Sequence, residues 1–145
     1  MQNLQFSIDI RAPKEKIWNI LWDNATFRDW ANNIDPGMYL AGTLEEGAEV
    51  QFCSASAEYA VRSLVEKFVP TEIASFRHLA DTMNGGTEER EHEWTGGVES
   101  YALTEHDGVT TLSISSGTPP EQVENFNAIW PKVLGRIKEL AEAGE

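Results

Sequence analysis

Apolar residues recur at helical spacing near the end of the chain, between Glu121 and Glu142. The apolar positions there are Val123, Phe126, Trp130, Val133, Leu134, Ile137, Leu140 and Ala141. An amphipathic helix of this kind needs an apolar surface to pack against. The pattern therefore predicts one long carboxy-terminal helix that lies on another apolar layer of the protein.

The start of this helix is better defined by the sequence than its middle. Thr118 precedes Glu121 by three residues, as in a capping box, and the prolines between them suit a first helical turn. Pro131 removes a backbone hydrogen bond from the helix interior, and Gly135 costs about 1 kcal/mol relative to alanine. We expect either a kink near Trp130 or a short helix followed by a second one that begins at Pro131.

Alternation of apolar and polar residues predicts strands along most of the remaining chain. Leu4, Phe6, Ile8 and Ile10 alternate with polar residues, which is typical of a half-buried strand. Further strands are predicted at residues 38–43, 48–53, 59–69, 73–80, 87–94, 98–105 and 109–115. Glycine-containing turns at residues 84–86 and 106–108 favour antiparallel hairpins.

Two short helices are predicted between the first strand and the others. Pro13 suits the first turn of one helix, and Asp23 or Asn24 caps the next. Their apolar positions are Ile17, Trp18, Ile20, Leu21 and Trp22 in the first and Phe27, Trp30 and Ala31 in the second. We predict an α+β fold and a single domain over residues 1–145, in which a curved antiparallel sheet of about six to seven strands surrounds the long helix.

The charge of the chain argues against two classes of partner. It has 24 acidic and 11 basic residues, a formal net charge of -13. Such a chain repels phosphate backbones and anionic lipid surfaces, so we expect neither nucleic acid nor a membrane as a partner. No apolar run reaches the roughly 20 residues of a spanning helix, and the amino terminus lacks a signal-peptide pattern. We expect a cytoplasmic protein that is a monomer or a weak homodimer.

Candidates for metal or covalent chemistry are few. Cys53 is the only cysteine, and its place in a strand pattern indicates a packed thiol rather than a nucleophile. Residues 88–93 alternate carboxylates along a strand, which suits a divalent cation or, more simply, an exposed edge strand that resists aggregation. His92 has no second histidine at ligand spacing, and no serine or cysteine has an evident base partner. We therefore expect neither a metal nor another cofactor.

His78 is the most interesting polar candidate. It shares one face of its predicted strand with Ala74, Phe76 and Ala80. If that face lines an internal cavity, His78 offers a hydrogen bond or a proton-transfer group inside an apolar wall.

Arg62 and Glu66 are the charged candidates on the preceding strand. They share a predicted face with Leu64 and Phe68. This placement makes them either inward polar groups or members of a surface pair.

Several stretches carry a resemblance to a known family. They are residues 10–18, 27–30, 46–47, 65–70, 99–103 and 108–112, together with Trp130, Leu134, Ile137, Lys138 and Leu140. With the predicted element order, these stretches resemble bacterial single-domain proteins similar to the carboxy-terminal domain of the activator of the Hsp90 ATPase, within the START-like (SRPBCC) superfamily. The resemblance implies the helix-grip fold, in which a bent sheet grips the last helix.

The resemblance also implies a cavity between sheet and helix, which relatives use for lipids, hydrophobic small molecules or polyketide-like substrates. A dry, rigid void of about 300 Å³ would cost roughly 7 kcal/mol, so such a space is wet, filled or collapsed. The abundant aromatic residues suit either an open or a partly filled cavity. The residues expected to contact a ligand are Trp30, Phe52, Leu64, Phe76, His78, Trp94, Tyr101, Phe126, Trp130 and Leu134.

Three functional hypotheses follow. The first is a non-catalytic protein that binds a small apolar or amphipathic molecule. The second is regulation of a protein partner, such as an Hsp90-type chaperone in a stress response. The third is an enzyme of cyclase, dehydratase or hydrolase type that uses His78, Arg62, Glu66 or Tyr101 as acid, base or orienting group.

Overall fold

The computed structural model describes residues 1–56, 59–83, 88–90 and 95–143 of the chain. Its elements, in chain order, are β1 (Gln2–Ile10), α1 (Lys14–Trp22), α2 (Asn24–Ala31), β2 (Tyr39–Gly42), β3 (Glu49–Cys53), β4 (Tyr59–Val69), β5 (Ile73–Met83), β6 (Glu88–Arg90), β7 (Val98–His106), β8 (Val109–Thr118), the short 3-10 turn η1 (Pro120–Gln122) and α3 (Val123–Glu142).

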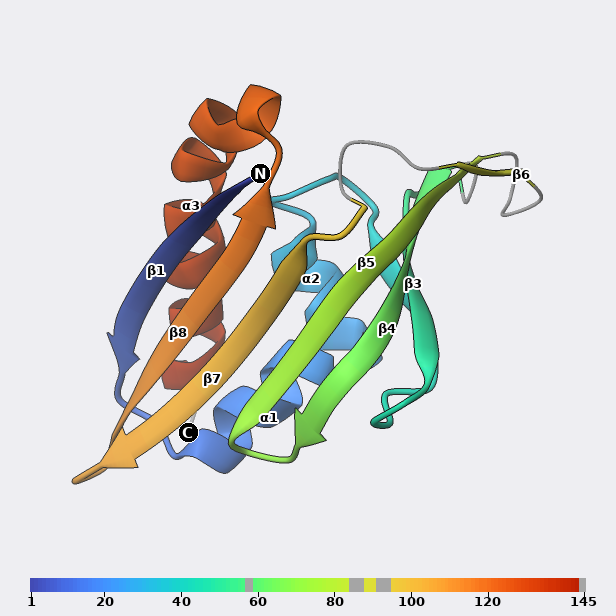
Figure 1. Cartoon of the computed structure of the whole chain (residues 1–145). Coiled ribbons are helices and arrows are strands. Elements are labelled where there is room, and N and C mark those ends of the chain that lie inside the picture. Colours follow the sequence, from blue (N-terminus) through green and yellow to red (C-terminus); the bar gives the residue numbers. More distant parts are fainter. Residues whose placement is uncertain (57–58, 84–87, 91–94, 144–145) are drawn as a thin grey trace.

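The strands form one antiparallel sheet with the order β1-β8-β7-β5-β4-β3-β2, and β6 adds to the end of β5. Figure 1 shows that the sheet is curved and that the three helices lie on one side of it. The long helix α3 packs against β1 and α1, whereas α2 packs against β2. This arrangement confirms the predicted α+β helix-grip fold, with two short helices after the first strand.

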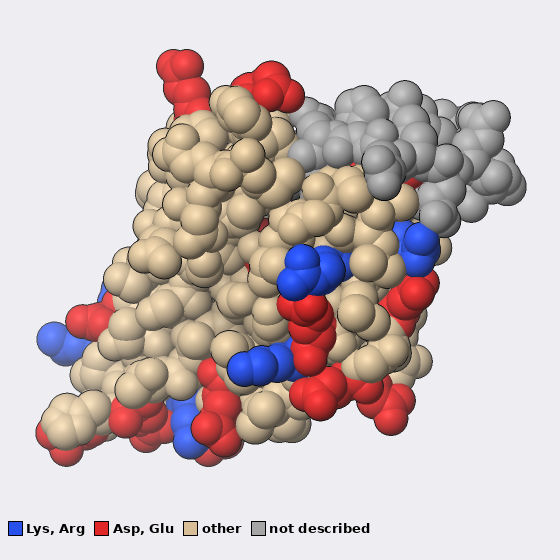
Figure 2. All heavy atoms as spheres, viewed as in Figure 1, with Lys and Arg blue, Asp and Glu red and all other residues tan. Residues whose placement is uncertain are grey.

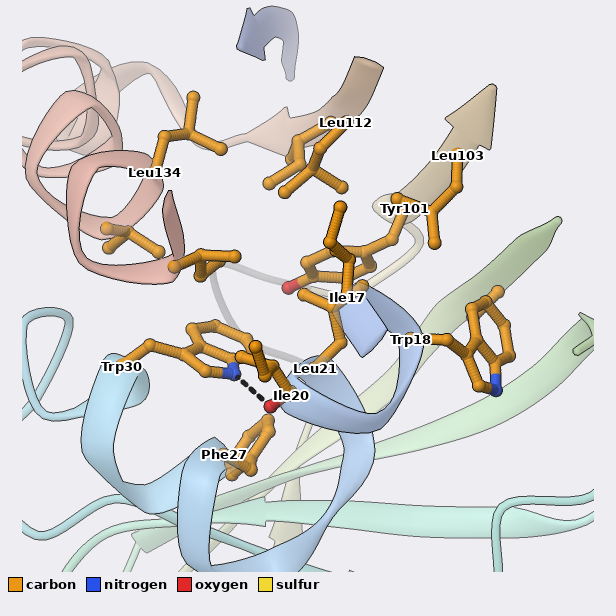
Figure 3. Packing of buried hydrophobic residues seen from close by; sticks show 14 of the residues in the cluster. Ile17, Trp18, Ile20, Leu21, Phe27, Trp30, Tyr101, Leu103, Leu112 and Leu134 are labelled. Atoms are coloured by element: carbon orange, nitrogen blue, oxygen red, sulfur yellow. Dashed lines mark hydrogen bonds between the residues drawn. The ribbon is translucent and has the colours of Figure 1, made fainter. Parts of the chain in front are cut away.

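Large apolar side chains from the helices and the inner face of the sheet form the core. Trp30, Trp130, Tyr101 and Phe27 are almost completely buried. Figure 3 shows side chains of α1, α2, α3 and β7 pointing toward one another, with Trp30 Nε1 donating a hydrogen bond to the carbonyl of Ile20 (3.1 Å). Each such aromatic contributes on the order of 2 kcal/mol or more through burial.

The last helix differs from the expectation at two points. Thr118 is the final residue of β8, and its hydroxyl bonds to the carbonyl of Ser116 (3.1 Å) rather than capping a helix, so the capping-box prediction was wrong. Helix α3 also continues through Pro131 as one element, so the alternative of a second helix that begins at Pro131 was wrong, whereas a kink near Trp130 stays a prediction. Because Trp130, Leu134 and their neighbours on the same side are buried, packing outweighs the hydrogen bond that Pro131 removes.

The strand β5 changes its partner at His78. Residues Ile73 to Arg77 pair with β7, whereas Asp81 to Met83 pair with β6. Between these two regions, the backbone groups of His78 bond to Gly96 and Gly97 in the segment that leads into β7. On this side of β5 the partner thus changes from β7 to β6 just after His78, a residue that lines the cavity described next.

Candidate functional site

A cavity of about 280 Å³, open on one side, lies between α2, the inner face of β3, β4, β5 and β7, and the first turns that lead into α3. Its apolar lining residues are Phe27, Trp30, Ile34, Met38, Phe52, Val61 and Phe126. Its other lining residues are Asp35, Cys53, Ser54, Tyr59, His78, Glu99, Tyr101, Gln122 and Asn125. The site is therefore a pocket that combines aromatic rings with hydrogen-bonding groups, as small-molecule sites do.

Glu99 and Tyr101 form the acidic part of this wall. They are two residues apart on β7, so both side chains point to the same face of the sheet. Burial raises the pKa of the Glu99 carboxyl to about 7, and a hydrogen bond with the Tyr101 hydroxyl opposes this rise only in part. Burial, followed by the nearby Glu99 charge, raises the pKa of Tyr101 well above its ordinary value. Glu99 therefore changes its charge near neutral pH, and Tyr101 stays protonated.

His78 is held in a second polar position of the same cavity. Its Nδ1 lies 2.7 Å from the Ser63 hydroxyl, and its ring meets Phe52 edge-on with centroids 6.1 Å apart. Burial lowers the pKa of His78 to about 4. The imidazole is consequently neutral at physiological pH, and it offers hydrogen bonding rather than charge.

Tyr59 and Asp81 form a third polar pair. The Tyr59 hydroxyl donates a hydrogen bond of 2.6 Å to the Asp81 carboxylate, which is completely buried. A register shift between Arg62 and Ser63 places Asp81 opposite Val61, a residue that lines the cavity. Simple alternation from His78 predicted Ala80 on this face, and the irregularity in the strand pairing is the reason for the difference.

The structure brings together about half of the residues that the sequence nominated as ligand contacts. Trp30, Phe52, His78, Tyr101 and Phe126 line the cavity. Their contact with a ligand stays a prediction. Trp94 lies outside the described residues.

Four other nominated residues do not line this cavity. Phe76 and Trp130 are buried, and each packs against the Tyr101 ring (6.3 and 6.2 Å between centroids). Leu134 belongs to the buried side of α3. Leu64 lies on the outer face of the sheet, because it pairs with Glu49 and Arg77, which are both exposed.

The charged candidates Arg62 and Glu66 lie outside the cavity as well. Arg62 forms an ion pair with Glu49 (2.8 Å), and Glu66 forms one with Arg77 (2.7 Å). Each of the two residues thus forms a surface ion pair with a residue of a neighbouring strand. Figure 2 shows acidic and basic side chains side by side over β4 and β5, whereas the surface over β7 and β8 is largely uncharged.

Sequence reasoning missed Glu99 and Tyr59 in the lining and Asp81, which bonds to Tyr59. It also missed the lining residues Asp35, Ser54, Gln122 and Asn125. A carboxylate two residues before Tyr101, on the strand face that Leu103 shares, is the signal that could have identified Glu99. Asp81 had no comparable signal, because its inward direction depends on the register shift in β4 and β5. An irregularity of that kind leaves little trace in a hydrophobic pattern.

Metal and thiol chemistry find little support in this region. Burial raises the pKa of the Cys53 thiol, which keeps the sulfur protonated. Among the described residues, no group of three or more His, Cys, Asp or Glu side chains is placed to hold a metal ion. Of the acidic cluster at residues 88–93, only β6 (Glu88–Arg90) belongs to the described backbone.

Within the part of the chain that the structure covers, none of the helices combines the length and the apolar character needed to cross a bilayer.

Comparison with known proteins matches the fold rather than a function. No protein-family model matches the chain, and no curated protein matches it. Among solved structures, the Aha1 dimer from Colwellia psychrerythraea has a TM-score of 0.74 at 21% identity and covers 100% of this chain and 99% of its own. Protein MLL2253 from Mesorhizobium loti has a TM-score of 0.74 at 15% identity, with 99% of each chain covered.

DynU16, a protein in the dynemicin biosynthetic locus, matches with a TM-score of 0.72 at 16% identity. This chain is covered completely and spans 49% of the DynU16 chain. Identities this low are informative about architecture alone. The chain therefore shares the helix-grip fold of these solved structures.

Proposed function

We propose that this protein binds a small amphipathic molecule in the cavity between sheet and helices. The observation that carries the proposal is the cavity of about 280 Å³ with six aromatic residues and several polar groups in its wall. A ligand that covers this wall gains roughly 25 cal/mol for each Å² of apolar surface removed from water. The polar groups orient the ligand, because an unmatched buried polar group costs about 1–3 kcal/mol.

A pair of tryptophan substitutions on one strand tests the proposal. Val61 lines the cavity opposite Phe52, whereas Leu64 lies on the outer face of the same strand. Val61→Trp fills the cavity. It is expected to abolish the binding of an apolar fluorescent dye that a competing ligand can displace. Leu64→Trp adds the same side chain elsewhere and is expected to bind the dye like the unmodified protein. Equal binding by Val61→Trp and Leu64→Trp would contradict the proposal.

Catalysis on the bound molecule is a second candidate, favoured by the pKa of Glu99. A carboxyl that titrates at about 7 is suited to general acid–base work at neutral pH. Tyr101 and His78 in the same wall are candidate orienting groups. The test uses a ligand that displaces the dye. After a prolonged incubation of this ligand with the protein, mass spectrometry shows whether the ligand has been converted. Recovery of the ligand unchanged with the native protein, as with a Glu99→Gln variant, speaks against catalysis on that ligand.

Interaction with an Hsp90-type chaperone, in the manner of a chaperone activator, is a third candidate. It is favoured by the similarity to the Aha1 dimer along the whole chain. Chaperone ATPase rates with and without the protein test it, and an unchanged rate together with no co-purification removes it. The dimeric state of that Aha1 structure also supports a weak homodimer of this protein, which light scattering at rising protein concentration measures.

A further inference from the structure

The described side chains that line the cavity include acidic groups but no strongly basic ones. Two carboxyl groups, those of Glu99 and Asp35, belong to the lining. Among the described residues, the lining contains neither lysine nor arginine. His78 is neutral at physiological pH because burial lowers its pKa to about 4. The part of the cavity wall formed by the described residues thus presents negative charge and hydrogen-bonding groups, without a cation to balance a bound anion.

The aromatic wall has the same electrostatic preference. Trp30, Phe52, Tyr59, Tyr101, Phe27 and Phe126 all border the space. The face of an aromatic ring attracts a cation, with a stabilisation of about 0.5–2 kcal/mol that grows as the site becomes drier. Rings and carboxyl groups therefore favour the same sign of ligand charge.

An anionic ligand meets the opposite conditions. Its carboxylate or phosphate group would leave water without a lysine or arginine partner among the described lining residues and would lie near Glu99. Burial of an unpaired charge is costly, and a neighbouring like charge adds to the cost. Fatty acids and other organic anions are accordingly poor candidates for this cavity.

We infer that the cavity selects a cationic amphipathic molecule, namely an organic ammonium compound whose ring body packs on the aromatic wall and whose ammonium group pairs with Glu99. This inference rests on the proposed binding function and names the chemical class of its ligand. The formal net charge of -13 acts in the same direction at longer range, because it attracts cations toward the protein.

The protonation of Glu99 gives the inference a pH signature. An ammonium group favours the ionised carboxylate, so its binding lowers the pKa of Glu99 from about 7 and releases a proton. Below this pKa, the ligand must first displace that proton. Affinity for a cation is therefore expected to rise with pH across neutrality, whereas affinity for a neutral ligand of the same shape is not.

Three probes with one ring system test the inference by isothermal titration calorimetry. They are naphthylmethylammonium, naphthylmethanol and naphthoate, which differ in the charge of the substituent. At about pH 8 the ammonium probe is expected to bind at least about tenfold more tightly than the alcohol, and naphthoate more weakly than either. The preference for ammonium over alcohol is expected to fall about tenfold between about pH 8 and about pH 6.

Two glutamate substitutions provide the matched comparison. Glu99→Gln is expected to reduce the preference for ammonium to about threefold or less and to remove its pH dependence. Glu72→Gln removes the same charge at an exposed turn between β4 and β5 and is expected to leave the preference unchanged. If Glu99→Gln folds poorly, the pH series on the unmodified protein still decides the question.

The possible outcomes separate the two proposals. Equal affinity for all three probes, lost in Val61→Trp, overturns the charge selectivity and leaves the binding function intact. Tighter binding of naphthoate than of the ammonium probe also overturns the selectivity. If none of the three probes binds, or if Val61→Trp does not weaken their binding, the result counts against the binding function itself.

Discussion

Arg136 on α3 donates two hydrogen bonds to the carboxylate of Asp29 on α2, with distances of 2.6 and 2.9 Å. The pair ties the long helix to the short helix that supplies Phe27 and Trp30 to the cavity wall. The Arg136 hydrogen bonds lower the pKa of Asp29, and its partial burial opposes this effect. A fork-shaped contact of this kind fixes the orientation of the two helices more than it adds free energy.

Asp29→Asn is expected to lower the thermal midpoint at neutral pH by only about 1–3 °C, because more than a third of each side chain is exposed and solvent screens the pair. Since the pKa of Asp29 is lowered, its contribution is present above the ordinary value of 3.8 and is lost as the pH falls through the folded-state pKa. The difference between variant and unmodified protein should therefore vanish in acid. Glu139→Gln, which alters the longer contact of Arg136 (3.4 Å), is the control and should have a smaller effect.

The architecture was predictable because it depends on hydrophobic periodicity over long segments. The apolar stripe from Val123 to Ala141 has the period of a helix and not of a strand. The alternation from Leu4 to Ile10 has the period of a strand and not of a helix. The wall of the cavity was less predictable, because it depends on local geometry. Asp81 turns inward through a register shift, and Leu64 turns outward because its partners in neighbouring strands do. A period-two pattern does not specify where such a shift occurs.

His78 is expected to destabilise the folded protein in mild acid. Burial lowers its pKa from 6.5 to about 4, so the unfolded state binds more protons between these two values. Stability should therefore decrease as the pH falls from about 6.5 to about 4, by up to about 3 kcal/mol from this residue. Urea denaturation of His78→Gln against the unmodified protein measures this loss. A variant with the same acid dependence as the unmodified protein would show that His78 is not the group responsible.

Glu99 is expected to act in the opposite direction over almost the same pH range. Its pKa is raised from 4.5 to about 7, so its favourable contribution is full below 4.5 and is lost as the pH rises through 7. Glu99→Gln should consequently be more stable than the unmodified protein at about pH 8, with about 3 kcal/mol as the upper limit. The two variants should have pH–stability curves of opposite slope. Identical slopes in Glu99→Gln and His78→Gln would contradict both assignments.

Gly135 offers a stabilising substitution that leaves the cavity untouched. It lies inside α3, and a methyl group added there meets no atom within 4 Å. Gly135→Ala is therefore expected to raise the free energy of unfolding by about 0.5–1 kcal/mol through helix propensity alone. Pro131→Ala, which restores a backbone donor in the same helix, should stabilise it further. Because Pro131 and Gly135 do not line the cavity, dye binding by both variants should match that of the unmodified protein. Weaker binding in either would mean that an irregular α3 is itself needed to keep the cavity open.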